Sequence, residues 1–91
     1  MKISRTSNFK RDYKKFKKKH YDMDKLAQVI KLIINGEKET LRTQYHDHML
    51  KGQYAGFREL HIEKDWLLVY KVDNNQLILT LIRTGTHDDL F

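Results

Sequence analysis

The chain has 91 residues, a length that indicates a single domain, residues 1–91. It has no cysteine, which excludes disulfides, thiolate zinc sites and cysteine nucleophiles. Nine basic residues against one acid give residues 1–20 a net charge of +8, whereas the other 71 residues carry −2. No segment is apolar enough for a signal peptide or a bilayer span, so we expect a cytoplasmic protein without a membrane partner.

The beginning of the chain predicts a strand followed by a basic helix. Residues 1–6 alternate weakly between apolar and polar side chains, which favours a short strand. Ser7 stands where a helix N-cap is expected, and three aromatic residues follow at helical spacing: Phe9, Tyr13 and Phe16. Lysines occupy the other faces of this helix. They indicate either a solvated surface or a site that attracts nucleic acid or an acidic protein.

A second helix is expected after a turn at residues 20–22. Asp22 or Asp24 is placed to cap it, and Asn35-Gly36 ends it, because glycine adopts the left-handed conformation without strain. The apolar side chains of this helix form one stripe: Met23, Leu26, Ala27, Ile30, Ile33 and Ile34. The two helices therefore form a hairpin with an apolar underside.

The second half of the chain predicts a sheet preceded by a long loop. Residues 37–53 show no sustained period, and we expect a loop that carries His46 and His48. Three strand-like runs follow, with turn residues between them: 54–63, 66–72 and 76–83. Thr86 is placed to cap one further helical turn. The order β-α-α-β-β-β predicts an α+β fold in which two N-terminal helices pack on a twisted antiparallel sheet.

Four of the five histidines lie in the second half of the chain: His46, His48, His61 and His87. Imidazole titrates nearest neutrality, so such a set suggests proton transfer or metal binding. If the apolar neighbours of His61 face the helices, His61 and Glu59 face the other side of the sheet. Asp65 follows in the next turn, and Arg83 and His87 lie where the last strand ends. The ends of neighbouring strands lie about 5 Å apart, which predicts one shared patch; the alternative is a set of unconnected surface residues.

Two chemistries fit such a patch. His46-X-His48 with a distant histidine or aspartate would make a three-ligand zinc centre, but the chain lacks cysteine and a pair of histidines one helical turn apart. A metal-free ribonuclease fits better, because RNA carries its own nucleophile in the 2′-hydroxyl. The protein need only accept that proton, protonate the leaving 5′-oxygen and stabilise the phosphorane charge. Two imidazoles, a carboxylate and Arg83 meet these needs without a cofactor.

Two aromatic residues are placed to contribute to such a site. Trp66 begins a predicted strand, and Phe91 follows His87 by four positions. Both can stack on a nucleobase and so position it for cleavage. For Trp66 the alternative is burial in the core, which is common for a large indole ring.

These residues, in this order, resemble the YafQ-type toxins of the RelE/ParE superfamily. The resemblance covers nearly the whole chain, and three segments carry it most clearly: DHMLKG at 47–52, GFRELHIEKDW at 56–66 and RTGTHDDLF at 83–91. The last segment is the most specific, because the spacing from His87 to Phe91 also agrees. Met49 stands where the pattern usually has proline.

The resemblance implies a ribosome-dependent mRNA endoribonuclease, or mRNA interferase, from a type II toxin–antitoxin pair. Such a toxin acts on mRNA codons in the ribosomal A site and is held inactive by an acidic antitoxin; the fold would be RelE/ParE-like. The functional positions of the family fall on these residues of this chain: His48, His61, Asp65, His87 and Phe91, with Glu59 as a possible auxiliary and Trp66 nearby. No family role transfers to His46, which we treat as incidental.

The residue types suggest a role for each member of the set. His87 is the expected general acid toward the 5′-oxygen, and His48 or His61 is the expected base on the 2′-hydroxyl. Asp65 would orient an imidazole or share the role of base, and Arg83 would stabilise the phosphorane.

Two rival functions share the expected architecture. Relatives of the ParE type have the same fold and are associated with DNA gyrase, so one alternative is a protein-binding poison without nuclease chemistry. A plain nucleic-acid-binding module that uses the basic helix is the other. Neither function needs the histidines, and their dispensability would distinguish both from a ribonuclease.

Overall fold

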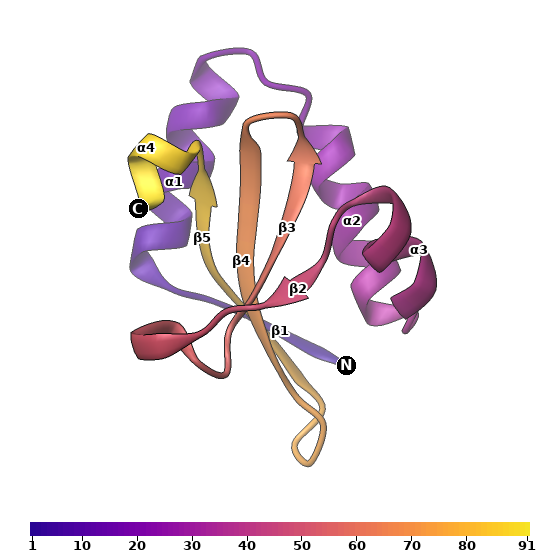
Figure 1. The fold of residues 1–91 in the computed structure, drawn as a ribbon. Coiled ribbons are helices and arrows are strands. Elements are labelled where there is room, and N and C mark those ends of the chain that lie inside the picture. Colours follow the sequence, from indigo (N-terminus) through magenta and orange to yellow (C-terminus); the bar gives the residue numbers. More distant parts are fainter.

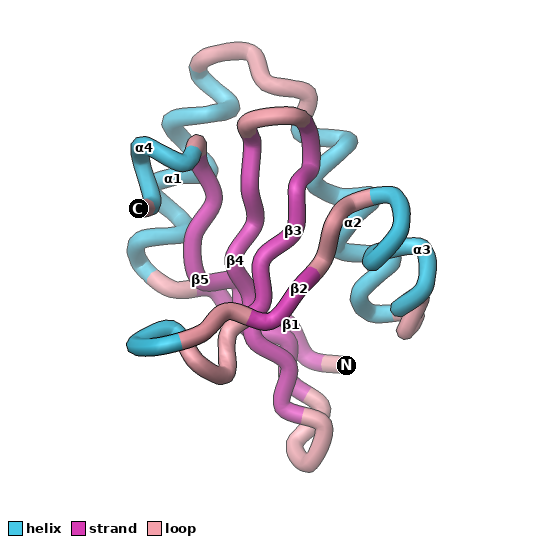
Figure 2. Tube along the Cα trace, viewed as in Figure 1, coloured by secondary structure: helices cyan, strands magenta, loops and turns pink.

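The computed structural model describes all residues, 1–91, as a five-stranded sheet packed against helices (Figure 1). The elements follow in chain order: β1 (Lys2–Arg5), α1 (Ser7–Lys18), α2 (Met23–Ile34), α3 (Lys38–Gln44), β2 (His48–Met49), the 3₁₀ helix η1 (Gly52–Tyr54), β3 (Arg58–Glu63), β4 (Trp66–Asp73), β5 (Ile78–Gly85) and α4 (His87–Leu90). The strands lie side by side in the order β1-β5-β4-β3-β2. Helices α1 and α2 lie behind the sheet in Figures 1 and 2, which leaves the front face free of both.

Most of the sheet is the antiparallel meander that the sequence predicts. β3 pairs with β4 and β4 with β5 in antiparallel fashion, and the short β2 adds to the outer edge of β3. β1 differs, because it runs parallel to β5, with Lys2 opposite Ile78. The helices and three other strands lie between β1 and β5 in the chain, so no hairpin joins these two strands. Without a hairpin, the two strands are free to pair in parallel. The α+β class is confirmed, but the sheet is mixed rather than wholly antiparallel.

One core forms between the helices and the sheet face that they cover. α1 packs over β5, and α2 packs over β3. The buried residues of this core are Phe9, Leu26, Val29, Ile33, Leu41, Leu60, Ile62, Trp66, Leu68, Tyr70, Leu79 and Leu81. The strand residues in this set recur at every second position, so the residues between them point to the other face. No helix of the structure has the length and apolar character that crossing a membrane requires.

The first two helices begin at capping residues close to those expected. Thr6, not Ser7, caps α1: its hydroxyl accepts a hydrogen bond from Phe9 N at 3.0 Å and donates one to a carbonyl of β5 at 2.6 Å. The prediction of Ser7 is wrong because the contact with β5 favours Thr6, and local sequence does not show that contact. Asp22, one of the two residues expected at this position, caps α2, and Gly36 follows that helix with a φ of +70°.

The prediction of a long loop at residues 37–53 is wrong. The segment contains α3, the two residues of β2, and the beginning of η1. Only Leu41 is buried in α3, so these seven residues show no helical period. β3 begins at Arg58 rather than at position 54, because Tyr54 belongs to η1. β5 spans Ile78–Gly85, two residues later than expected.

Candidate functional site

The sheet face opposite α1 and α2 carries several of the polar side chains that the sequence predicts to meet. On β3, Leu60 and Ile62 point into the core, so Glu59 and His61 point to the other face. The β2–β3 register places His48 directly opposite Glu59. Directly opposed residues share a face of the sheet, so His48, Glu59 and His61 lie together there.

Glu59 is a buried carboxylate between two imidazoles. Its Oε1 lies 3.7 Å from Nε2 of His48 and 3.8 Å from Nε2 of His61. Burial lowers the pKa of His61; the charge of Glu59 opposes this effect, and His46 and His87 reinforce it. His61 is therefore neutral at pH 7, and a neutral imidazole can accept a proton.

His87 is held by Asp65. α4 begins at His87, directly after Thr86, which forms a reciprocal capping box with Asp89, so the predicted turn capped by Thr86 is confirmed. Asp65, in the β3–β4 turn, accepts hydrogen bonds from Nδ1 of His87 at 3.0 Å and from its backbone N at 3.2 Å. These bonds lower the pKa of Asp65, so the carboxylate is ionised at neutral pH. An ionised carboxylate only accepts hydrogen bonds, which places a proton on Nδ1 and leaves Nε2 for another partner.

The group around Glu59 lies next to the His87–Asp65 pair. We call these five residues the histidine cluster: His48, Glu59, His61, Asp65 and His87. The ring centroids of His61 and His87 lie 5.7 Å apart, with an angle of 65° between the ring planes. The structure thus brings together five of the residues that the sequence singled out, from β2, β3, the β3–β4 turn and the start of α4. The cluster offers one neutral imidazole and one imidazole that a carboxylate orients, within reach of a single small group.

His46, which the sequence analysis treats as incidental, also lies against the cluster. Its ring centroid is 5.6 Å from that of His61, and its φ of +55° is left-handed. Together with Tyr45, His61 and Lys64 it lines an open hollow of about 580 Å³. The spacing of two residues between His46 and His48 is the sequence signal for this placement, although by itself it suggests only a pair of zinc ligands.

Phe91 is exposed and pairs with an aromatic residue that the sequence analysis missed. The rings of Tyr54 and Phe91 lie 5.5 Å apart and perpendicular to each other, and 54% of Phe91 is exposed. Phe91 N donates a hydrogen bond to the carbonyl of His87 at 2.8 Å, which holds this pair next to the cluster. An exposed aromatic pair so close to an imidazole can stack on a base.

Trp66 does not reach the cluster, and its predicted role in positioning a base is wrong. The side chain is 1% exposed, and its Nε1 donates a hydrogen bond to Thr84 Oγ1 at 2.9 Å. Its ring packs against Phe16 and Tyr21 in the core. The face of β4 on which Trp66 lies is covered by the helices, so no base can stack on the indole.

Arg83 is bound to α1 rather than to the cluster. Its Nε donates to Asp12 Oδ2 at 2.7 Å and its Nη2 to Asp12 Oδ1 at 3.1 Å, and the hydrogen bond to Asp12 raises the pKa of Arg83. Thr84 N also donates to Asp12, at 3.1 Å. No ion pair joins Arg83 to a residue of the cluster. The role of Arg83 at the phosphorane stays a prediction, and it depends on the guanidinium donors that Asp12 leaves free.

The cluster also offers ligands for a metal ion, in a different set from the one that His46-X-His48 suggests. Glu59, His61 and His87 each present one ligand atom, and the three atoms lie within 4.8 Å of one another. Carboxylate and imidazole ligands suit Zn²⁺ and Cu²⁺. The same atoms would exchange protons in a metal-free reaction, so the two uses exclude each other.

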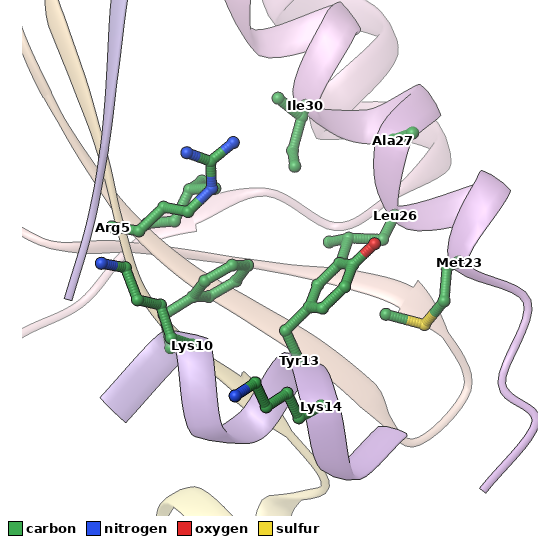
Figure 3. A pocket seen from close by; sticks show the side chains of 10 residues that line it. Arg5, Lys10, Tyr13, Lys14, Met23, Leu26, Ala27 and Ile30 are labelled. Atoms are coloured by element: carbon green, nitrogen blue, oxygen red, sulfur yellow. The ribbon is translucent and has the colours of Figure 1, made fainter. Parts of the chain in front are cut away.

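A separate groove lies between α1 and α2 on the helix side of the sheet (Figure 3). Its volume is about 510 Å³, and its wall is mainly apolar, with Phe9 and Leu26 among the lining residues. Three cations also line it: Arg5, Lys10 and Lys14. No residue of the histidine cluster borders this groove.

The family described as "Bacterial toxin of type II toxin-antitoxin system, YafQ" matches residues 1–91. The class of protein is therefore that of bacterial type II toxins, as the resemblance of the three sequence segments implies.

Individual relatives agree over almost the full length. The mRNA interferase toxin YafQ of Escherichia coli strain K12 is 39% identical over 89 residues, which are 98% of this chain and 94% of that protein. The crystal structure of the E. coli DinJ–YafQ complex matches with a TM-score of 0.85 at 39% identity, over 98% of this chain and 96% of that one. A metal-bound toxin from Helicobacter pylori matches with a TM-score of 0.89 at 34% identity, over 100% and 99% of the two chains. The chain belongs to the YafQ family.

Replacement of the buried carboxylate tests the electrostatics of the cluster. In a Glu59→Gln variant we expect the pKa of His61 to fall further, because the charge of Glu59 raises it. NMR titration of the His61 ring measures this, with Glu63→Gln as a control on the same strand. The pKa of His61 in the folded chain lies below its ordinary value of 6.5. Between the folded and the unfolded pKa, the unfolded chain binds more protons, so the free energy of unfolding rises with pH in that range. An unchanged or higher pKa of His61 in Glu59→Gln would contradict the electrostatic effect of Glu59 on His61.

Proposed function

We propose that the chain is an mRNA interferase, a ribosome-dependent endoribonuclease that uses the RNA 2′-hydroxyl as its nucleophile. The observation that carries the proposal is the pair of adjacent imidazoles, His61 beside the buried Glu59 and His87 bonded to Asp65. The name mRNA interferase toxin of the E. coli relative supports the same activity. Because its substrate is a message on the translating ribosome, the toxin acts in the cytoplasm.

The geometry supports distinct roles for the two imidazoles. His61 is neutral because its pKa is lowered, so it serves as the base that accepts the proton of the 2′-hydroxyl. His87, oriented through Nδ1 by Asp65, presents Nε2 as the general acid toward the leaving 5′-oxygen. Glu59 lies between His48 and His61 and stabilises positive charge on either ring as the proton arrives. Cleavage would give a 2′,3′-cyclic phosphate and a 5′-hydroxyl.

Binding surfaces flank these groups. Tyr54 and Phe91 form the exposed aromatic pair on which a base of the codon stacks. The lysines of α1 are exposed and supply contacts to ribosomal RNA, whose strength should fall as salt rises. The clustered histidines favour a ribonuclease over a gyrase-binding poison, because binding to gyrase does not require them.

Removal of the proposed general acid is the central test. We expect His87→Ala to reduce cleavage by at least about 10²-fold, because a positioned acid or base contributes about 10²–10⁴-fold. Primer extension on a translated message in cells that express the toxin measures this. His20→Asn is the matched control, since His20 is exposed in the α1–α2 turn and forms no ion pair or ring contact with the cluster. Full cleavage by the folded His87→Ala variant would overturn the assignment.

We further propose that a cognate acidic antitoxin binds the groove between α1 and α2. E. coli YafQ forms a complex with DinJ. In this chain the apolar wall of the groove and its cations Arg5, Lys10 and Lys14 suit an amphipathic segment with acidic residues at its border. The groove does not border the cluster, so the groove would anchor the antitoxin rather than block the histidines by itself.

Two variants of neighbouring residues test this groove. Ala27 lines it, and Ala27→Glu fills it with a negative charge, so we expect antitoxin affinity to fall at least about tenfold, as a loss of about 1.4 kcal/mol would produce. Gln28→Glu adds the same charge beside the groove and should change the affinity little. Calorimetric titration with the cognate antitoxin measures both, and equal affinities would contradict the proposal.

Metal ions offer a second use of the cluster, which one comparison favours. The H. pylori relative is described as metal-bound, and Glu59, His61 and His87 of this chain present a ligand set. A bound ion would occupy the imidazole and carboxylate lone pairs to which protons bind during cleavage. We propose that Zn²⁺ or Cu²⁺ at these residues inhibits cleavage.

The sign of the metal effect separates inhibitor from cofactor. Cleavage should persist after EDTA once magnesium is restored for the ribosome, and micromolar Zn²⁺ should reduce it reversibly. His87→Ala should weaken Zn²⁺ binding in a calorimetric titration, whereas His20→Asn should not. A requirement for Zn²⁺ in the ribosome-dependent assay would contradict the metal-free reaction.

A further inference from the structure

The tripeptide His46-Asp47-His48 has a buried middle and exposed flanks. Asp47 is 7% exposed, whereas both histidines are exposed. A carboxylate is costly to bury unless it is paired and hydrogen-bonded. Family resemblance assigns a role to His48 but leaves Asp47 without one, so the burial of this charge calls for a structural explanation.

Two side chains from neighbouring strands bind the Asp47 carboxylate. Arg58 Nε donates to Oδ1 at 2.7 Å, and Tyr70 donates its hydroxyl proton to Oδ2. Arg58 and Tyr70 are directly opposed in the β3–β4 register, so they reach Asp47 from one face of the sheet. Burial and the Asp47 charge both raise the pKa of Tyr70, which keeps its hydroxyl a donor. The backbone N of Asp47 also bonds the carbonyl of Leu41, at 3.0 Å.

These contacts lie on the helix side of the sheet, and the histidine cluster lies on the other side. Successive residues of an extended chain point to opposite faces, so anchoring Asp47 directs His48 outward, opposite Glu59. Nδ1 of His48 lies 2.8 Å from the carbonyl oxygen of His46, and His61 N donates to the Tyr45 carbonyl at 2.7 Å. Tyr45 is thus bonded to β3 on the N-terminal side of Asp47, whereas the His48–His46 contact lies within the segment.

We propose that Asp47 is a positioning residue, whose bonds to Arg58 and Tyr70 hold His48 against Glu59 from the opposite face of the sheet. β2 is only two residues long, so its own ladder holds His48 weakly. Asp47 touches no reacting atom and acts through the backbone of the next residue. The proposal deepens the nuclease function and rests on it for its effect on rate.

The test compares Asp47→Asn and Tyr70→Phe with Val29→Ala. Asn and Phe keep the shapes of the originals but remove the charge or the hydroxyl. Val29→Ala instead loosens a buried position of α2 whose side chain forms no hydrogen bond with Asp47. At a temperature at which all three are folded, kcat for ribosome-dependent cleavage should fall about 10- to 100-fold in the first two variants, as a displacement of about 1 Å can cause, with little change in KM. Val29→Ala should keep the parental kcat.

A second measurement does not depend on activity. NMR contacts between the His48 ring and Glu59 should weaken in Asp47→Asn and Tyr70→Phe, while those between His61 and His87 persist. The kcat of the double variant should fall little below that of either single variant, because both changes release the same segment, His46-Asp47-His48. Parental kcat in Asp47→Asn, or an equal loss in Val29→Ala, would overturn the proposal. If the parent chain does not cleave message at all, the nuclease function fails; the His48–Glu59 contact then decides alone, and its persistence in Asp47→Asn overturns the role of Asp47.

Discussion

The alternation of β3 between two environments is the constraint on which the rest of the site depends. Leu60 and Ile62 are buried beneath the helices, and their burial obliges Glu59 and His61 to face the other way. A slip of one residue would exchange the two sets and place the polar groups in the core. Hydrophobic burial on one side of the sheet thus fixes the position of Glu59 and His61 on the other.

Two carboxylates in different surroundings make the imidazoles unequal. Asp65 is exposed in a turn and orients His87 by direct hydrogen bonds, whereas Glu59 is buried and lies between two rings without a short contact. Burial also lowers the pKa of His61. Environments that differ in this way give chemically identical side chains separate tasks as acid and base, which is a general route to proton transfer near neutral pH.

Periodic patterns predicted most of the fold. The apolar stripe of α2, its cap at Asp22 and the three meander strands each depend on residues close in sequence, so a single chain reveals them. The segment 37–53 was predicted wrongly because its elements are short and bury few side chains. The parallel pairing of β1 with β5 depends on how helices cover the sheet, which no local pattern encodes.

By itself, the sequence determined the α+β class, the family and the residue types of the cluster, because strand alternation and the segments that resemble the family are local properties. Only the tertiary structure decided that Trp66 is buried, that Asp12 binds Arg83, that His46 joins the cluster and that Asp47 is anchored beneath it. Each of those outcomes is a contact between segments distant in the chain. Such contacts form only when the helices and strands pack, and packing is a property of the whole chain.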